Sequence, residues 1–202
     1  MRHARWRLLL FVCASAVPGY WLYLAAVFAL GPDPGKVIVD NLGQGALVLL
    51  LASLAMTPLQ RATGWSGWIS FRRQLGLWSF AYAVLHLAGF FYFLLGLDFE
   101  GLADELVERP YIAVGAIALL GMLVLASTST RGSMRRLGKR WKKLHRLVYP
   151  ILLTVLLHML WVVRSDIGLW SLYASIAAAL LAARLPFVQP VLMRLRSLRT
   201  DR

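Results

Sequence analysis

Residues 74–97, QLGLWSFAYAVLHLAGFFYFLLGL, decide the fold of this chain. They form an apolar run in which His86 is the only basic residue and no residue is acidic. A helix of about 20 apolar residues crosses a bilayer. Backbone polar groups must be paired internally in lipid, and the alternating pattern of barrel strands is absent here. The run is therefore predicted to be a membrane-spanning helix.

Five further apolar runs of similar length occur in the 202 residues, at about 8–30, 38–57, 110–128, 147–163 and 168–187. Hydrophobic residues make up 59% of the chain and charged residues only 15%, which excludes an ordinary soluble globular protein. No internal repeat is evident. We predict an all-α integral membrane protein, a six-transmembrane-helix bundle with a single domain over residues 1–202 and a basic tail at 188–202.

The charged residues divide between the segments that join the runs. If the N-terminus is cytoplasmic, the inner segments hold all but three of the 22 Lys and Arg residues, the exceptions being Lys36, Arg109 and Arg164. All of the nine acidic residues except Asp201 then fall in the outer segments. The positive-inside rule thus predicts that both termini are cytoplasmic. This orientation accounts for the net charge of +13 without a nucleic-acid partner.

Histidines are the notable polar residues of the predicted spans. The only acidic residue within a predicted span is Asp40, near the outer end of the 38–57 run, so the usual carboxylate relay of a proton-coupled transporter is missing. His86 lies 13 residues past Arg73, and His158 lies 12 residues past Arg146, on spans that run in the same direction. At 1.5 Å per residue, both imidazoles are predicted to lie roughly 18–20 Å from the cytoplasmic edge.

Two imidazoles at one depth favour a shared cofactor. Iron protoporphyrin fits best, because two neutral imidazole nitrogens can fill its axial positions, whereas a lone zinc or copper ion would need further ligands. Cys13 is the only cysteine, which excludes a cysteine-ligated iron–sulfur cluster. An intramembrane histidine can also bond a neighbouring carbonyl, so a cofactor-free bundle remains the alternative.

A second level is predicted nearer the cytoplasm. His145 lies 13 residues before His158, near the depth of Arg72 and Arg73. An arginine there could pair with a haem propionate or a flavin phosphate, or it could simply anchor the helix end. On an ideal helix, His145 and His158 lie roughly 140° apart around the axis, although Pro150 between them could change the winding.

Three stretches carry a resemblance to a known family. They are RRQLGLWSFAYAVLHL at 72–87, STSTRGSMRRLGKRWKKLHRLVY at 127–149 and LLHMLW at 156–161, and they resemble the ferric-reductase-like transmembrane superfamily. With TPL at 57–59 and ERPYIAVG at 108–115, the whole chain is similar to the MsrQ (YedZ) family within it.

The resemblance implies haem b, one or two per chain, and FMN, in a bacterial inner membrane. It places the axial ligands of the haem iron at His86, His158 and His145. Arg72 or Arg73 stands where the wider superfamily often has a fourth histidine. The pair His86 and His158 is therefore the ligand pair that the resemblance supports best.

The same resemblance implies a role in electron transfer. Electrons would pass from quinol or a cytoplasmic flavin reductase to a periplasmic molybdopterin-containing methionine sulfoxide reductase, which repairs oxidised periplasmic proteins. The sulfoxide chemistry then belongs to that partner. The alternatives are a cofactor-free anchor or assembly factor and a stand-alone ferric or cupric reductase. Against the latter, the chain lacks a glycine-rich nucleotide fingerprint.

Two charged segments are candidate contact surfaces. The acidic segment 98–109, DFEGLADELVER, is predicted to be a short interfacial helix that could dock the periplasmic partner. The basic loop 131–146 could receive a flavin or an acidic reductase, or could contact anionic membrane lipid. For each segment, ordinary solvation or anchoring is the simpler interpretation.

Overall fold

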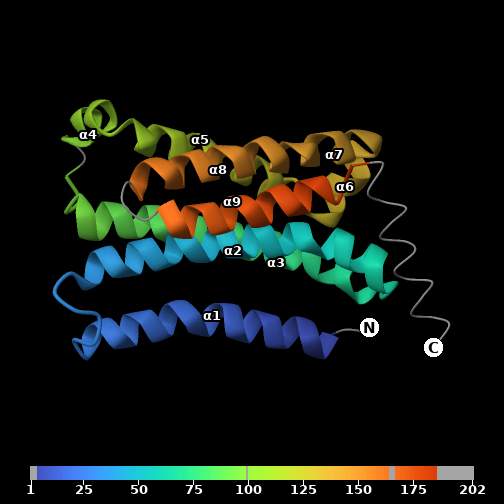
Figure 1. The fold of residues 1–202 in the computed structure, drawn as a ribbon, viewed down its shortest axis with the longest axis horizontal. Coiled ribbons are helices and arrows are strands. Elements are labelled where there is room, and N and C mark those ends of the chain that lie inside the picture. The colour runs from blue at the N-terminus through green and yellow to red at the C-terminus, as the bar shows by residue number, and fades with distance from the viewer. Residues whose placement is uncertain (1–3, 99, 164–166, 186–202) are drawn as a thin grey trace.

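The computed structural model describes residues 4–98, 100–163 and 167–185, and the elements assigned within these ranges are all helices (Figure 1). The predicted all-α class is therefore confirmed for them. In chain order the elements are α1 (Ala4–Ala26), α2 (Pro34–Thr63), α3 (Gly67–Gly89), the π-helix η1 (Phe90–Leu94), α4 (Leu102–Glu108), α5 (Pro110–Ser127), α6 (Arg131–Leu137), α7 (Lys139–Leu144), the 3-10 helix η2 (His145–Leu147), α8 (Val148–Val162) and α9 (Ile167–Ala182).

Five helical stretches of the described chain are long and apolar enough to cross a bilayer. They are Ala4–Ala26, Pro34–Thr63, Gly67–Leu94, Pro110–Ser127 and Lys139–Val162. The sixth predicted span coincides with α9, which has 16 residues. At 1.5 Å per residue α9 is about 24 Å long, short of the roughly 30 Å of a hydrocarbon core. Residues 186–187 of that predicted span, and the basic tail at 188–202, lie outside the described residues.

Local signals set the ends of α2. Asp33 caps the helix by accepting a hydrogen bond from the backbone N–H of Lys36 at 3.0 Å, and Pro34 occupies the first turn, where its missing N–H costs nothing. Gly64 ends the helix in the left-handed conformation with φ of 75°. The chain can therefore turn sharply into α3, which runs back beside α2.

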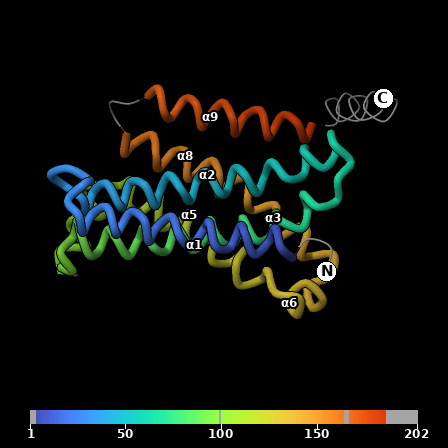
Figure 2. The backbone as a smooth tube through the Cα atoms, turned by 90° about the horizontal axis from the view of Figure 1, so that it is seen from below, coloured from blue at the N-terminus to red at the C-terminus, as the bar shows by residue number. Residues whose placement is uncertain are grey.

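Two helical hairpins form the centre of the molecule. One is α2 packed along α3, and the other is α5 packed along α8. They meet where α3 contacts α5, while α9 lies against α8 and α2 (Figures 1 and 2). The outer helix α1 packs mainly against α2 and α3, so it forms one edge of the bundle.

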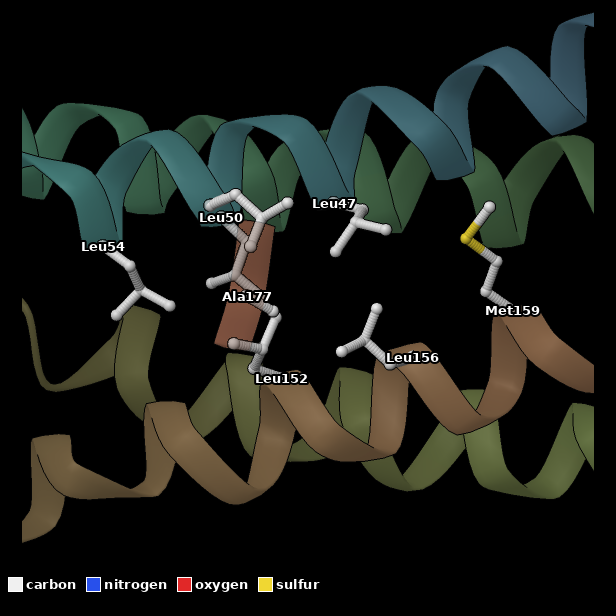
Figure 3. Packing of buried hydrophobic residues seen from close by; sticks show 8 residues of the cluster. Leu47, Leu50, Leu54, Leu152, Leu156, Met159 and Ala177 are labelled. Atoms are coloured by element: carbon white, nitrogen blue, oxygen red, sulfur yellow. The ribbon is translucent and has the colours of Figure 1, made fainter. Parts of the chain in front are cut away.

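The largest cluster of buried apolar side chains lies between the two hairpins and α9. Its members are Leu47, Leu50, Leu51, Leu54, Leu152, Leu156, Met159 and Ala177. Figure 3 shows the side chains of α2 and α8 pointing toward one another with α9 beside them. In a membrane such packing acts through close contact, because lipid tails are as apolar as leucine.

Pro18 interrupts the hydrogen bonds of α1, and a neighbouring helix compensates. Proline has no N–H, so the carbonyl of Ala14, four residues earlier, receives no helical donor. The hydroxyl of Tyr82 on α3 donates to that carbonyl at 2.8 Å. Nearer the basic end, Gln74 donates to the carbonyl of Arg7 at 2.7 Å. These two bonds hold α1 against α3.

Pro58 has the same effect in α2, where it leaves the carbonyl of Leu54 without a helical donor. Arg184, which follows α9, donates to this carbonyl from Nη2 at 2.6 Å. It also donates from Nη1 to the carbonyl of Leu180, and its guanidinium lies 5.7 Å from the ring centre of Tyr149. The end of α9 is therefore tied to α2 through a half-buried arginine.

Charge separates along the bundle as the sequence predicts. The short helix α4 confirms the predicted helix in the acidic segment, and it lies at the end opposite α6 and α7 (Figure 1). α6 and α7 hold most of the basic loop, including Arg131, Arg136 and Lys143. Arg164, Asp166 and the basic residues beyond 185 lie outside the described residues.

Candidate functional site

His86 on α3 and His158 on α8 lie face to edge between the two hairpins. Their ring centroids are 6.3 Å apart, and the ring planes make an angle of 85°. The prediction that the two imidazoles meet at one depth is confirmed by this contact. The histidines come from different hairpins, so the docking of one hairpin on the other, where α3 contacts α5, brings them together.

Each imidazole is oriented by a backbone carbonyl of its own hairpin. Nδ1 of His86 lies 2.8 Å from the carbonyl oxygen of Val39, and Nδ1 of His158 lies 2.7 Å from that of Tyr111. A carbonyl only accepts, so Nδ1 carries the proton and donates. Nε2 of the neutral ring then keeps its lone pair, and neither Nε2 has a hydrogen-bond partner in the described part of the chain.

A glycine leaves room for each ring. A Cβ on Gly43 would lie 3.0 Å from Nδ1 of His86, and a Cβ on Gly115 would lie 2.8 Å from Cε1 of His158. In both hairpins the accepting carbonyl lies 47 residues before the histidine, and the glycine lies four residues after that carbonyl. The two hairpins thus repeat one arrangement, which the sequence analysis missed although the equal glycine-to-histidine spacing could have shown it.

The pair fits an iron porphyrin. Metal–imidazole bonds measure about 2 Å and the ring centre lies about 1 Å further, so two imidazoles on one metal have centroids about 6 Å apart. The observed separation is 6.3 Å. Among the described residues no group of three or more His, Cys, Asp and Glu side chains could hold a metal ion. Two axial nitrogens in an apolar bundle suit haem better than a bare ion.

His145 lies apart from this pair, in the 3-10 turn before α8. Pro150 follows five residues later, where a proline disfavours regular α-helix in the preceding turn. The helix winding therefore changes between His145 and Pro150, where the sequence predicts that it could. His145 stacks on Trp141 with centroids 4.0 Å apart, its Nδ1 lies 3.2 Å from the Trp141 carbonyl, and its Nε2 lies 3.5 Å from Oγ of Ser129. Both of its nitrogens thus face protein polar atoms.

The two predicted arginines occupy different surroundings. Arg72 is half-buried, donates to Oγ1 of Thr57 at 3.3 Å and lies within Coulombic range of His145. Arg73 is exposed and has no hydrogen bond or ion pair with the described residues. The structure therefore turns Arg72 toward His145, whereas Arg73, the next residue of α3, is exposed.

Two further arginines, which the sequence analysis treated only as inner charges, gather near Arg72. Arg184 lies within Coulombic range of both Arg72 and Arg61, and Nη1 of Arg61 is buried without a hydrogen-bond partner in the described chain. Nothing in the spacing of Arg61, Arg72 and Arg184 along the chain signals this meeting. It depends on α9 returning to α2.

The chain is similar to a known family and to known proteins. Residues 42–156 match the family model described as "Ferric reductase like transmembrane component". The chain is also 49% identical, over 160 residues, to the "Protein-methionine-sulfoxide reductase heme-binding subunit MsrQ" of Xanthomonas axonopodis pv. citri (strain 306). That alignment covers 77% of this chain and 72% of the relative.

Proposed function

Because this chain belongs to the MsrQ family of ferric-reductase-like membrane proteins, we propose that it is a haem b electron-transfer subunit serving a methionine sulfoxide reductase. The relative's name supplies haem binding and the association with the reductase. The observation that carries the proposal for this chain is the pair of imidazoles 6.3 Å apart, each with Nε2 available.

His86 and His158 would hold the haem iron through their two Nε2 atoms. Their Nδ1–H groups donate to the carbonyls of Val39 and Tyr111, which fixes both rings and raises the basicity of Nε2. When bound, haem supplies one-electron exchange between ferric and ferrous iron. The apolar surroundings exclude water and so help to set the reduction potential.

A second cofactor is proposed at the level of His145. The family resemblance favours a second haem or FMN there. His145 would serve as an axial ligand, for which its weak 3.5 Å contact with Ser129 would have to open. Half-buried Arg72 is placed to pair with a propionate or a flavin phosphate. Exposed Arg73 would contact a cofactor or donor only at the surface.

The charge separation supports an orientation in the membrane, and the proposed donor and acceptor then set the direction of electron flow. The basic end, with α6 and α7, faces the cytoplasm of a bacterial inner membrane. The donor is quinol or a cytoplasmic flavin reductase. The acceptor is a periplasmic molybdopterin enzyme docked at the acidic α4 end. There, two electrons and two protons convert a methionine sulfoxide to methionine and water.

The test is the haem content of purified variants. Wild-type protein should show the reduced-minus-oxidised spectrum of six-coordinate b-type haem. His86→Ala and His158→Ala should each remove most of it, since either change leaves one axial position empty. His3→Ala, a change outside the described residues, should leave it intact. His145→Ala, with iron and porphyrin quantified per chain, separates one haem from two. Full haem content in both His86→Ala and His158→Ala would contradict the proposal and favour a cofactor-free bundle.

A further inference from the structure

A cavity of about 660 Å³ lies between the outer helix α1 and the α2–α3 hairpin. Its walls are mostly apolar, and it is a wide, largely open groove rather than a closed pocket. Clefts of this size and character accommodate small ligands. Its lining includes two amide side chains of α2, Asn41 and Gln44, together with Trp21 and Tyr82.

Two amides in the first half of α2 lack hydrogen-bond partners in the described chain. Asn41 and Gln44 are half-buried, and neither forms a hydrogen bond with the described chain. They follow Pro34, the first residue of α2, by seven and ten residues, which places them about 10–15 Å along the helix. An amide without a partner at that depth in lipid is costly. A ligand with its own polar atoms would satisfy both groups.

The cavity lies across one helix from the histidine pair. Gly43, between the two amides in the sequence, faces the ring of His86 on α3. Tyr82, one turn before His86, lines the cavity and holds α1 through its bond to the carbonyl of Ala14. A ligand in the cavity is therefore separated from the His86 ring by little more than α2.

We propose that this cavity binds the ring of a quinol or quinone, with Asn41 and Gln44 bonded to its two oxygens. An amide both donates and accepts, so the same residues suit the hydroxyls of the quinol and the carbonyls of the quinone. A lipid acyl chain would leave both amides unpaired. The assignment rests on the proposed function, in which quinol is one possible donor. The quinol loses two electrons and two protons and becomes a quinone. The electrons would leave one at a time for the haem that His86 and His158 would hold, and the protons go to water.

Cys13 provides a direct test, because it is the only cysteine and lines the cavity from α1. We would measure its alkylation by N-ethylmaleimide in detergent, by mass spectrometry, with and without decylubiquinone. The ring of this quinone is fully substituted and offers no free carbon to the thiol. Bound quinone should slow alkylation about fivefold or more. The matched control is Cys13→Ser with Val12→Cys, which moves the thiol to an exposed position of α1 outside the cavity and should show no protection.

Asn41→Leu and Gln44→Leu remove the amides at nearly constant volume, and Gln60→Leu removes one from α2 outside the cavity. Each cavity variant should raise the half-protecting quinone concentration about fivefold to tenfold, the loss of one hydrogen bond, and Gln60→Leu should not. Absence of protection, equal protection in the control, or unchanged protection in both amide variants would overturn the assignment. Haem content, recorded on the same samples, reports separately on the proposed function. Haem without protection rejects only the cavity, whereas protection without haem rejects only the electron-transfer role.

Discussion

Gly43 and Gly115 decide how closely the two functional rings can approach the helices that orient them. Each ring is fixed by a hydrogen bond to a backbone carbonyl, so it cannot move away from an added methyl group without losing that bond. The two glycines are therefore part of the ligand geometry although neither would touch the cofactor. This makes them a more specific test of the site than replacement of the histidines.

Gly115→Ala and Gly43→Ala should lower haem content and shift the haem reduction potential. The new Cβ would lie 2.8 Å from the His158 ring in the first variant and 3.0 Å from the His86 ring in the second, so Gly115→Ala should have the larger effect. Overpacking of this kind costs about 1–3 kcal/mol. Redox titration and haem quantification measure the effect. Gly19→Ala, where no atom lies within 4 Å, is the matched control. Normal haem in Gly115→Ala would show that the ring is free to move.

Counting residues was enough to predict the histidine pair, because both spans run in the same direction and a helix rises by a constant amount per residue. It could not predict the accepting carbonyls of Val39 and Tyr111. These depend on how far α2 slides along α3 and α5 along α8, which packing sets. Gly43 and Gly115 looked like ordinary glycines of apolar helices for the same reason.

At the scale of elements, proline and its partner act as one unit. Pro18 removes the N–H that would bond the carbonyl of Ala14, and Tyr82 supplies the replacement from another helix. The bond from Tyr82 joins α1 to the bundle, while α1 itself lacks one internal hydrogen bond. The sequence marks the proline, but the partner lies 68 residues from Ala14 and only the fold brings them together.

A double-mutant cycle should reveal this unit. Tyr82→Phe alone should lower the free energy of unfolding by about 1 kcal/mol, because the carbonyl loses its donor in lipid. In a Pro18→Ala background, the alanine N–H can bond the Ala14 carbonyl, so Tyr82→Phe should cost measurably less. Unfolding in mixed micelles measures all four proteins. Equal costs in both backgrounds would mean that the two residues act independently.

The apolar runs predicted the long helices well, because length and hydropathy alone determine which segments must be helical in lipid. The ends were predicted less well. α2 continues to Thr63, beyond its apolar run, because Gly64 rather than the change in polarity stops it. Pro150 predicts a change of winding near His145, where the structure has a 3-10 turn. The orientation of the His145 ring could not be predicted, because stacking on Trp141 fixes it.

For the whole molecule, the separation of charge between the two ends predicts the orientation in the membrane. In a Cys13→Ser background, Asp104→Cys on α4 and Arg136→Cys on α6 place single thiols at exposed positions of opposite ends. A membrane-impermeant maleimide added to intact spheroplasts should label the α4 thiol and spare the α6 thiol until the cells are lysed. The reverse pattern would invert the proposed topology.

The acidic end also predicts a salt-dependent partnership. Asp104→Asn with Glu108→Gln should slow the association with the proposed periplasmic reductase a few-fold at low ionic strength, since both exposed carboxylates would steer a partner with a basic docking face. The difference from wild type should vanish near 0.5 M salt, where screening is strong. Stopped-flow haem oxidation by the partner measures it, with the haem spectrum as the control. An association rate that changes neither with salt nor with the two substitutions would contradict a docking role for α4.

The origin of the two proposed axial imidazoles in different hairpins has a consequence for biogenesis. A ribosome delivers the α2–α3 hairpin to the membrane well before α8 emerges, so a nascent chain offers a porphyrin only one imidazole of the His86–His158 pair. Capture with both axial positions filled must wait until the second hairpin has been inserted and has docked on the first. Maturation should therefore be post-translational, and chains truncated before α8 should accumulate without pigment.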